Sequence, residues 1–185
     1  MVAEMRWLKE HYSPDHIWFM DDILGLKPGW LEHFAELLEQ KDLRIPFKSL
    51  NRADLLLRGN TVDALRRAGG QEVWLGAESG SQKVLDAMEK GTQVEQVYAA
   101  ARLLHEAHIK VGFFLQFGYP GEGREDIEKT LQMVREGKLT ATLGWMSKDM
   151  GQLSMEAILE YLYGYNPRPE MPFTYELVTI QNITK

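Results

Sequence analysis

The sequence contains no cysteine among its 185 residues. Disulfide bonds are therefore excluded, and so is every metal centre that needs thiolate ligands, including iron–sulfur clusters and the cysteine types of zinc site. The five histidines do not replace them, because their spacings match no zinc motif. We therefore expect no metal ligands within this chain.

Long hydrophobic runs are also missing. No apolar stretch approaches the roughly 20 residues that a membrane-spanning helix needs, and the first twelve residues are charged and amphipathic, unlike a signal peptide. The net charge of −6 provides no general attraction to nucleic acid or to anionic membranes. We therefore expect a cytoplasmic protein without a nucleic-acid partner or a membrane span.

Short apolar runs alternate with amphipathic helical stretches over most of the chain. Four runs have the composition of strands, at residues 16–20, 45–50, 72–77 and 110–117. Each is followed by a segment with helical periodicity, and this alternation predicts a parallel sheet with right-handed crossovers. A doubly wound sheet and a (β/α) barrel both satisfy the pattern, so the α/β class is predicted without a choice between them.

The pattern weakens after Gly137. We predict one strand at residues 139–145 and one helix at residues 153–162, with no clear element from Tyr161 onward. The chain is thus expected to contain a core domain at residues 1–137 and a divergent C-terminal segment at 138–185.

Charged residues follow the first two predicted strands, where parallel α/β proteins place functional groups. Asp21 and Asp22 follow the first run, and Arg52 and Asp54 follow the second. Two carboxylates suit a metal, a ribose hydroxyl or an amine, and arginine suits a carboxylate or phosphate. The ordinary interpretation of these residues is a solvated loop and a surface ion pair.

Glycine-containing turns follow the third and fourth predicted strands. In the turn 78–81, Glu78 suits hydroxyl or ammonium donors, and the serines suit an anionic group. A helix-capping turn explains the serines well but explains Glu78 less well. The turn 118–121 exposes backbone that suits contact with a flat ring, although Pro-Gly alone indicates only a turn.

Four segments in this order resemble the radical S-adenosylmethionine (SAM) superfamily, especially its cobalamin-associated branch of the anaerobic magnesium-protoporphyrin cyclase type. The segments are HIWFMDD (16–22), SLNRAD (49–54), WLGAESGSQKVLDAMEKG (74–91) and HIKVGFFLQFGYPGEGREDIEKTL (108–131). The resemblance implies a partial (β/α) barrel of parallel strands with outer helices that binds SAM across the strand ends. In the family, a [4Fe–4S] cluster on a CxxxCxxC loop cleaves SAM to a 5′-deoxyadenosyl radical, which abstracts hydrogen from a substrate.

The resemblance assigns seven residues to SAM binding and none to catalysis. Asp22 and Arg52 would lie near its amino group and its carboxylate, and Glu78 and Ser79 would contact its ribose and methionine portions. The turn near the adenine would be formed by Gly118, Pro120 and Gly121.

The chain departs from the family at its beginning. The family's first barrel strand and its cysteine loop would precede Val2, so we expect a sheet without its first strand. We also expect a fragment of a radical SAM enzyme that is inactive alone, with cobalamin use left open for a full-length protein. The alternatives are a cluster-free SAM-binding, nucleotide-binding or scaffold protein, and an unrelated enzyme with a divalent metal on Asp21, Asp22 and Glu78.

Overall fold

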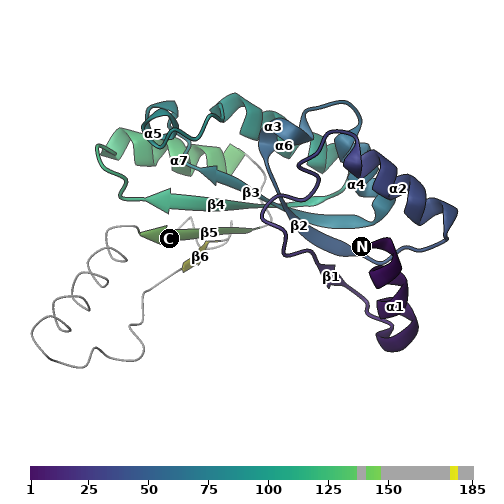
Figure 1. The fold of residues 1–185 in the computed structure, drawn as a ribbon. Helices are drawn as coiled ribbons and strands as arrows, with labels where there is room; N and C mark the ends of the chain where they lie inside the picture. Colours follow the sequence, from purple (N-terminus) through teal and green to yellow (C-terminus); the bar gives the residue numbers. More distant parts are fainter. Residues whose placement is uncertain (137–140, 147–175, 179–185) are drawn as a thin grey trace, which may run out of the picture.

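The computed structural model describes residues 1–136, 141–146 and 176–178. In this part of the chain, one sheet has the strand order β1-β2-β3-β4-β5-β6, with β1 to β5 parallel and β6 antiparallel to β5. The strands are β1 (Ile17–Trp18), β2 (Phe47–Asn51), β3 (Gly70–Glu78), β4 (Lys110–Phe117), β5 (Ala141–Met146) and β6 (Glu176–Val178) (Figure 1).

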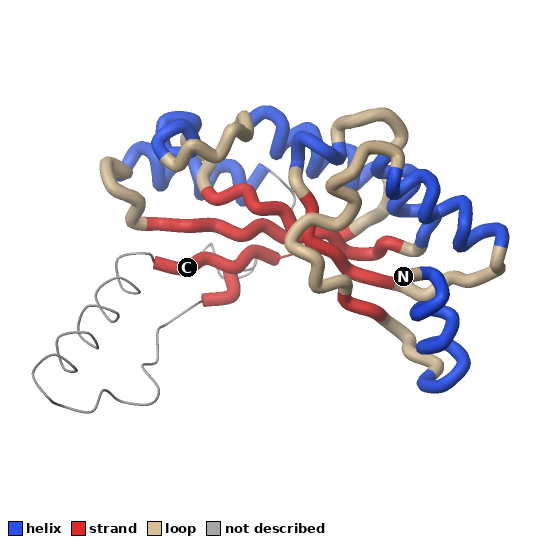
Figure 2. Tube along the Cα trace, viewed as in Figure 1, coloured by secondary structure: helices blue, strands red, loops and turns tan. Residues whose placement is uncertain are grey.

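Each parallel strand pairs with the next one along the chain, so the winding never reverses direction. A doubly wound sheet reverses at a switch point, whereas right-handed crossovers that all run one way place their helices on one face. Figures 1 and 2 show this one-sided arrangement, which is that of a partial (β/α) barrel. The predicted α/β fold class is therefore confirmed, and of the two architectures left open the structure has the partial (β/α) barrel.

The helices on that face connect successive strands. They are α2 (Trp30–Gln40), α3 (Ala53–Leu56), α4 (Thr61–Ala68), α5 (Gln82–Ala87), α6 (Val94–Glu106) and α7 (Arg124–Glu136). Helix α1 (Val2–Tyr12) precedes β1 and contacts α2. None of the described helices is long and apolar enough to cross a membrane.

The core lies between the sheet and these helices. Burial alternates along β2, where Phe47, Ser49 and Asn51 are buried and the residues between them are partly exposed. Phe113 on β4 and Leu104 on α6 are also fully buried. Period-two alternation therefore assigns one face of β2, β3 and β4 to the core and leaves the opposite face for the barrel interior.

The strand predictions differ in accuracy. Strand β4 has the predicted bounds, whereas β1 has only two residues. Strand β5 confirms a strand near 139–145, and it pairs with β4, so the sheet continues beyond residue 137. The expectation of no element after Tyr161 is wrong, because the strand β6 lies at residues 176–178. This short strand pairs antiparallel with β5. The predicted helix at 153–162 lies outside the described residues.

The burial pattern predicts a strong contrast between two identical substitutions. Leu104→Ala removes a side chain that is 0% exposed and should lower the free energy of unfolding by about 2–5 kcal/mol. Leu26→Ala removes one that is 60% exposed and should change it by no more than about 0.5 kcal/mol. Urea denaturation measures both values, and similar losses at the two positions would contradict the assigned core.

Candidate functional site

A cavity of about 470 Å³ opens at the C-terminal edge of the sheet. Asp22 from the loop after β1, Arg52 from the residue after β2 and Glu78 from the end of β3 all line it. Adjacent parallel strands end at the same edge, which is why residues far apart in sequence meet there. The structure thus brings together three of the seven predicted site residues.

Glu78 is placed by an unusual backbone turn. Its φ is 59°, and the Ser79 N–H donates to the Ala77 carbonyl at 2.7 Å, so Glu78 occupies the centre of a γ-turn. The pairing of β3 with β4 is also irregular between Gly76 and Glu78. A left-handed conformation costs a non-glycine residue roughly 1–2 kcal/mol, so surrounding contacts must hold it.

Lys90 holds the Glu78 carboxylate. Its Nζ donates to Glu78 Oε1 at 2.7 Å, and the Glu78 side chain is only 14% exposed. A Cβ atom at Gly76 would lie 3.1 Å from Glu78 Oε1 and 3.4 Å from Lys90 Nζ, so glycine leaves the pair its space. Lys90 was missed as a site residue, although it lies within the segment 74–91 on which the family resemblance rests.

Arg52 combines the two interpretations offered for it. Its Nε donates to Asp54 Oδ1 at 2.9 Å, which is the expected surface ion pair. The same side chain lines the cavity and remains 44% exposed. Because the guanidinium has five N–H donors, the bond to Asp54 leaves others for a ligand.

The loop that contains Asp22 is tied to the end of β2. The Leu24 N–H donates to the Leu50 carbonyl at 2.8 Å, and Asn51 Nδ2 donates to the Leu24 carbonyl at 2.9 Å. Ser49 Oγ in turn donates to Asn51 Oδ1 at 2.7 Å. These buried bonds position Asp22, which is itself exposed, at the mouth of the cavity.

A divalent-metal site at this edge finds no support in the described residues. Within them, no group of three or more histidine, aspartate or glutamate side chains has an arrangement that holds a metal ion. The grouping of Asp21, Asp22 and Glu78 that such a site needs is thus not formed.

Ser79 and Gly80 pack against α7 and do not line the cavity. Ser79 Oγ lies 3.1 Å from Thr130 Oγ1, and the Gly80 N–H donates to the same oxygen at 2.9 Å. A Cβ atom at Gly80 would lie 2.5 Å from the Lys129 carbonyl oxygen, so only glycine fits here. Ser79 therefore has a clear packing role, and its contact with SAM stays a prediction.

Asp126, in the first turn of α7, binds residues that follow β3 and residues that follow β4. Its Oδ1 accepts from the Ser81 hydroxyl at 2.6 Å, and its Oδ2 accepts from Lys83 Nζ at 2.8 Å and the Gly123 N–H at 3.0 Å. Lys83 Nζ also donates to the Gly121 carbonyl at 2.8 Å. The hydrogen bonds from Lys83, Ser81 and Gly123 hold the pKa of the buried Asp126 carboxyl well below its usual range.

The predicted turn after β4 is a type II turn. The Glu122 N–H donates to the Tyr119 carbonyl at 2.9 Å, Pro120 and Gly121 occupy the central positions, and Gly121 has φ 84°. Glu122 Oε2 accepts from the Gly118 N–H at 2.6 Å. Gly118, Pro120 and Gly121 do not line the cavity, so their place near an adenine stays a prediction.

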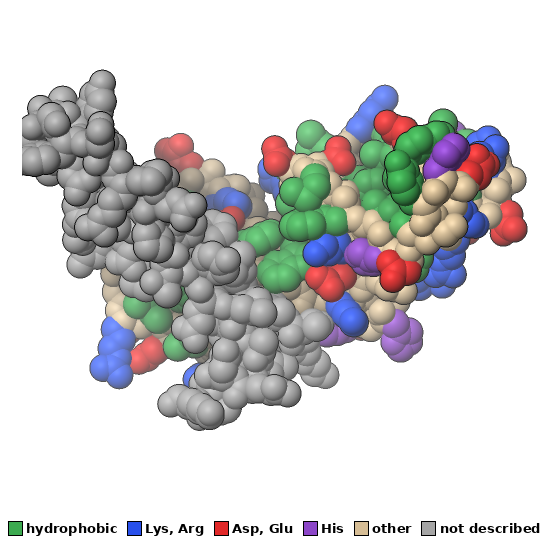
Figure 3. Space-filling model, turned by 90° about the horizontal axis from the view of Figure 1, so that it is seen from below, with side chains coloured by type: hydrophobic (Ala, Val, Ile, Leu, Met, Phe, Trp, Pro, Cys, Tyr) green, Lys and Arg blue, Asp and Glu red, His purple; other side chains and the backbone are tan. Residues whose placement is uncertain are grey.

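Trp74 and Phe114 form an aromatic wall of the cavity, with ring centroids 5.0 Å apart. Their neighbours Leu75 and Phe113 are fully buried on the helix side, so alternation directs these two rings to the opposite face. Figure 3 views that face and shows hydrophobic side chains gathered beside charged ones. Sequence patterning treated both residues only as strand interior, although the same alternation was the available signal.

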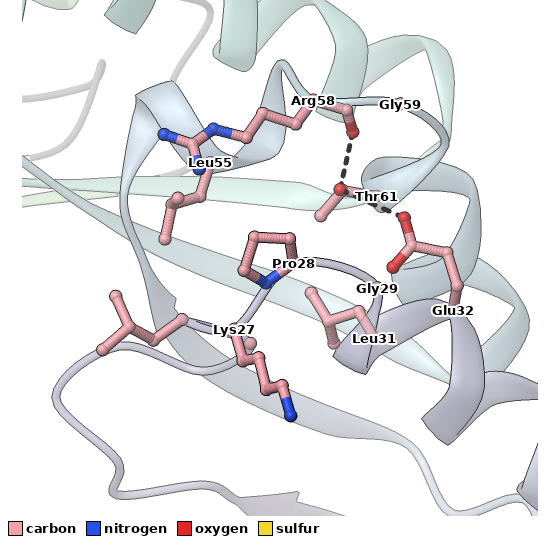
Figure 4. Close-up of a pocket in the computed structure, with 11 residues that line it drawn as sticks. Lys27, Pro28, Gly29, Leu31, Glu32, Leu55, Arg58, Gly59 and Thr61 are labelled. Atoms are coloured by element: carbon pink, nitrogen blue, oxygen red, sulfur yellow. Dashed lines mark hydrogen bonds between the residues drawn. The ribbon is translucent and has the colours of Figure 1, made fainter.

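A second cavity, of about 230 Å³, lies between the segments that precede α2 and α4 (Figure 4). Thr61 Oγ1 donates to the Arg58 carbonyl at 2.6 Å and lies 3.5 Å from Glu32 Oε1. None of the seven predicted site residues lines this cavity. The cavity at the C-terminal edge of the sheet, which three of them line, is therefore the candidate site.

Comparison with known proteins gives a consistent family. The model of the radical SAM superfamily matches residues 1–134. An uncharacterized methyltransferase of Pyrococcus horikoshii is 24% identical over 137 residues, covering 74% of this chain and 29% of the relative. The anaerobic magnesium-protoporphyrin IX monomethyl ester cyclase of Rubrivivax gelatinosus is 33% identical over 104 residues, covering 56% and 19%.

A solved structure shares the fold. The radical SAM methyltransferase TsrM from Kitasatospora setae, with tryptophan substrate and a SAM analogue bound, matches with a TM-score of 0.68 and 20% identity. The match covers 77% of this chain and 29% of TsrM, which has also been solved with cobalamin and a [4Fe–4S] cluster. The chain thus spans less than a third of the length of each of these three proteins.

The environment of Asp126 predicts a specific pH dependence. Its folded pKa lies below the unfolded value of about 3.9, so the charged carboxylate stabilises the fold above that pH, and this stabilisation is lost as the pH falls towards the folded pKa. Asp126→Asn should therefore be less stable than wild type at pH 7, and the difference should shrink steadily below about pH 4. Thermal melting from pH 7 to pH 2 measures it.

Ser81→Ala provides the companion measurement. It removes one hydrogen-bond donor to Asp126 but keeps Lys83. At pH 7, its melting temperature should therefore lie between those of wild type and Asp126→Asn. Parallel melting curves for wild type and Asp126→Asn across this pH range would contradict the stabilising role of the carboxylate.

Proposed function

The chain belongs to the radical SAM superfamily, and we propose that it forms the part of such an enzyme that holds SAM at the C-terminal edge of the sheet. The observation that supports this is the cavity at which Asp22, Arg52 and Glu78 meet. Its volume of about 470 Å³ lies within the range of small-molecule sites.

The three side chains match the polar groups of SAM. The Asp22 carboxylate suits an ammonium group, and the Arg52 guanidinium suits a carboxylate. Glu78 accepts from ribose hydroxyls, and its ion pair with Lys90 restricts its orientation before a ligand arrives. The turns that contain the other four assigned residues are proposed to border the bound molecule: Ser79, Gly118, Pro120 and Gly121.

When bound beside a [4Fe–4S] cluster, SAM supplies the 5′-deoxyadenosyl radical of this family. The present chain has no cysteine, so its residues do not fit such a cluster. We propose that the cluster ligands come from outside these 185 residues, and that this chain alone binds SAM without cleaving it. Its own residues bind and orient SAM and contribute an apolar wall that excludes water from one side of the cavity.

The alternative is a protein that uses the same cavity for SAM or another nucleotide without any cluster. The absence of cysteine favours that alternative, whereas the family match favours the enzyme-derived function. The substrates in the names of the relatives, tryptophan for TsrM and a magnesium-protoporphyrin ester for the cyclase, belong to those proteins. For this chain we propose only a small-molecule substrate.

Calorimetric titration of the 185-residue chain with SAM tests the proposal. We expect one site per chain and ten- to hundredfold weaker binding in Glu78→Gln, because a hydrogen bond to a charged group contributes about 1.5–3 kcal/mol. Glu128→Gln is the matched control, since Glu128 is 60% exposed on α7 and pairs with Arg124 outside the cavity.

Two results would contradict the proposed site. If the wild-type chain binds no SAM at millimolar concentration, the proposed SAM-binding function is wrong. Equal affinities of wild type and Glu78→Gln would show that SAM binds elsewhere on the chain.

A further inference from the structure

The interior face of the sheet is arranged in layers. Residues at equivalent heights pair across the strands. One row contains Leu50, Trp74 and Gly112, and the next row towards the strand ends contains Gly76 and Phe114. The row beneath the Trp74 row contains Lys48, Glu72 and Lys110. Two rows that contain the flat side chains of Trp74 and Phe114 therefore lie between this charged row and Glu78 at the end of β3.

Trp74 is fixed in this layer at two points. Its Nε1–H donates to Glu72 Oε1 at 2.6 Å, which sets the rotation of the indole. A Cβ atom at Gly112 would lie 2.6–2.8 Å from three indole ring atoms, so one face of the ring rests directly on the Gly112 backbone. The ring is thus held flat against the sheet before any ligand binds.

Trp74 lines the cavity of about 470 Å³ beside Phe114, and it is partly exposed. A rigid indole face offers its full area only to another flat surface, and aromatic rings gain from offset stacking beyond the area they bury. A saturated ring of the same size makes fewer close contacts with such a face. The chemistry of this wall therefore selects for a planar aromatic group.

We propose that Trp74 is a stacking platform for the planar aromatic ring of a second ligand, which binds beside SAM in the same cavity. The assignment of that ring to the molecule on which SAM acts rests on the proposed function. The preference of Trp74 for a planar ring is independent of the proposed function. Asp22, Arg52 and Glu78 stand at the strand ends, and Gly76 separates Trp74 from Glu78 on the same face of β3, so the two ligands have separate contacts.

Equilibrium dialysis with 2-naphthol and its saturated analogue decahydro-2-naphthol tests the platform. The wild-type chain should bind 2-naphthol about tenfold more tightly than the analogue. Trp74→Ala should lose this preference by removing the ring. Gly112→Ala should lose it while keeping the ring, because the new methyl group displaces the indole. Trp7→Ala, at a tryptophan 48% exposed on α1, should keep it.

Adding saturating SAM to the same dialysis separates the two proposals. Retention of 2-naphthol beside bound SAM supports two ligands in the cavity, whereas displacement by SAM would overturn the inference, because SAM would then occupy the platform itself. Equal binding of the two probes, or an unchanged preference in Trp74→Ala, would overturn it as well. If SAM does not bind but the aromatic preference remains, the proposed function and the co-substrate assignment fail, while the platform is supported.

Discussion

The buried carboxylate of Asp126 is the interaction on which the geometry of the candidate site depends. Three donors surround it, from Ser81, Lys83 and Gly123, and they offset the cost of removing a charge from water. Two of these donors lie after β3 and one lies after β4, so a single side chain on α7 ties together the turns at two strand ends. The strained conformation of Glu78, just before the first of these turns, then persists because its neighbours cannot move away.

Much of the fold follows from local pattern. The run at 110–117 predicts a strand with correct bounds, because its β-branched and aromatic residues outweigh the single glycine at 112. The strand order could not be predicted from the hydrophobic pattern, since helices of similar length connect the strands of a barrel and of a doubly wound sheet. The strand at 176–178 was missed because three residues have no local signal, and their conformation depends on pairing with β5.

The site was predictable where topology alone decides it. Asp22, Arg52 and Glu78 meet because parallel strands end together, which the alternation of elements already implies. The orientation of Ser79 was not predictable, since it depends on packing against Thr130, 51 residues later in the chain. The same non-local dependence explains why the role of Asp126 did not emerge from sequence spacing, since its partners Ser81 and Lys83 lie more than 40 residues earlier.

Amide hydrogen exchange of wild type and Asp126→Asn at neutral pH tests the central claim most directly, which is that one carboxylate organises both turns. The account predicts faster exchange in Asp126→Asn at Gly80 and Ser81 after β3 and at Gly118 and Gly123 after β4, with the central β3 amides unchanged. Faster exchange at only one of the two turns, or an equal increase across the whole sheet, would contradict it.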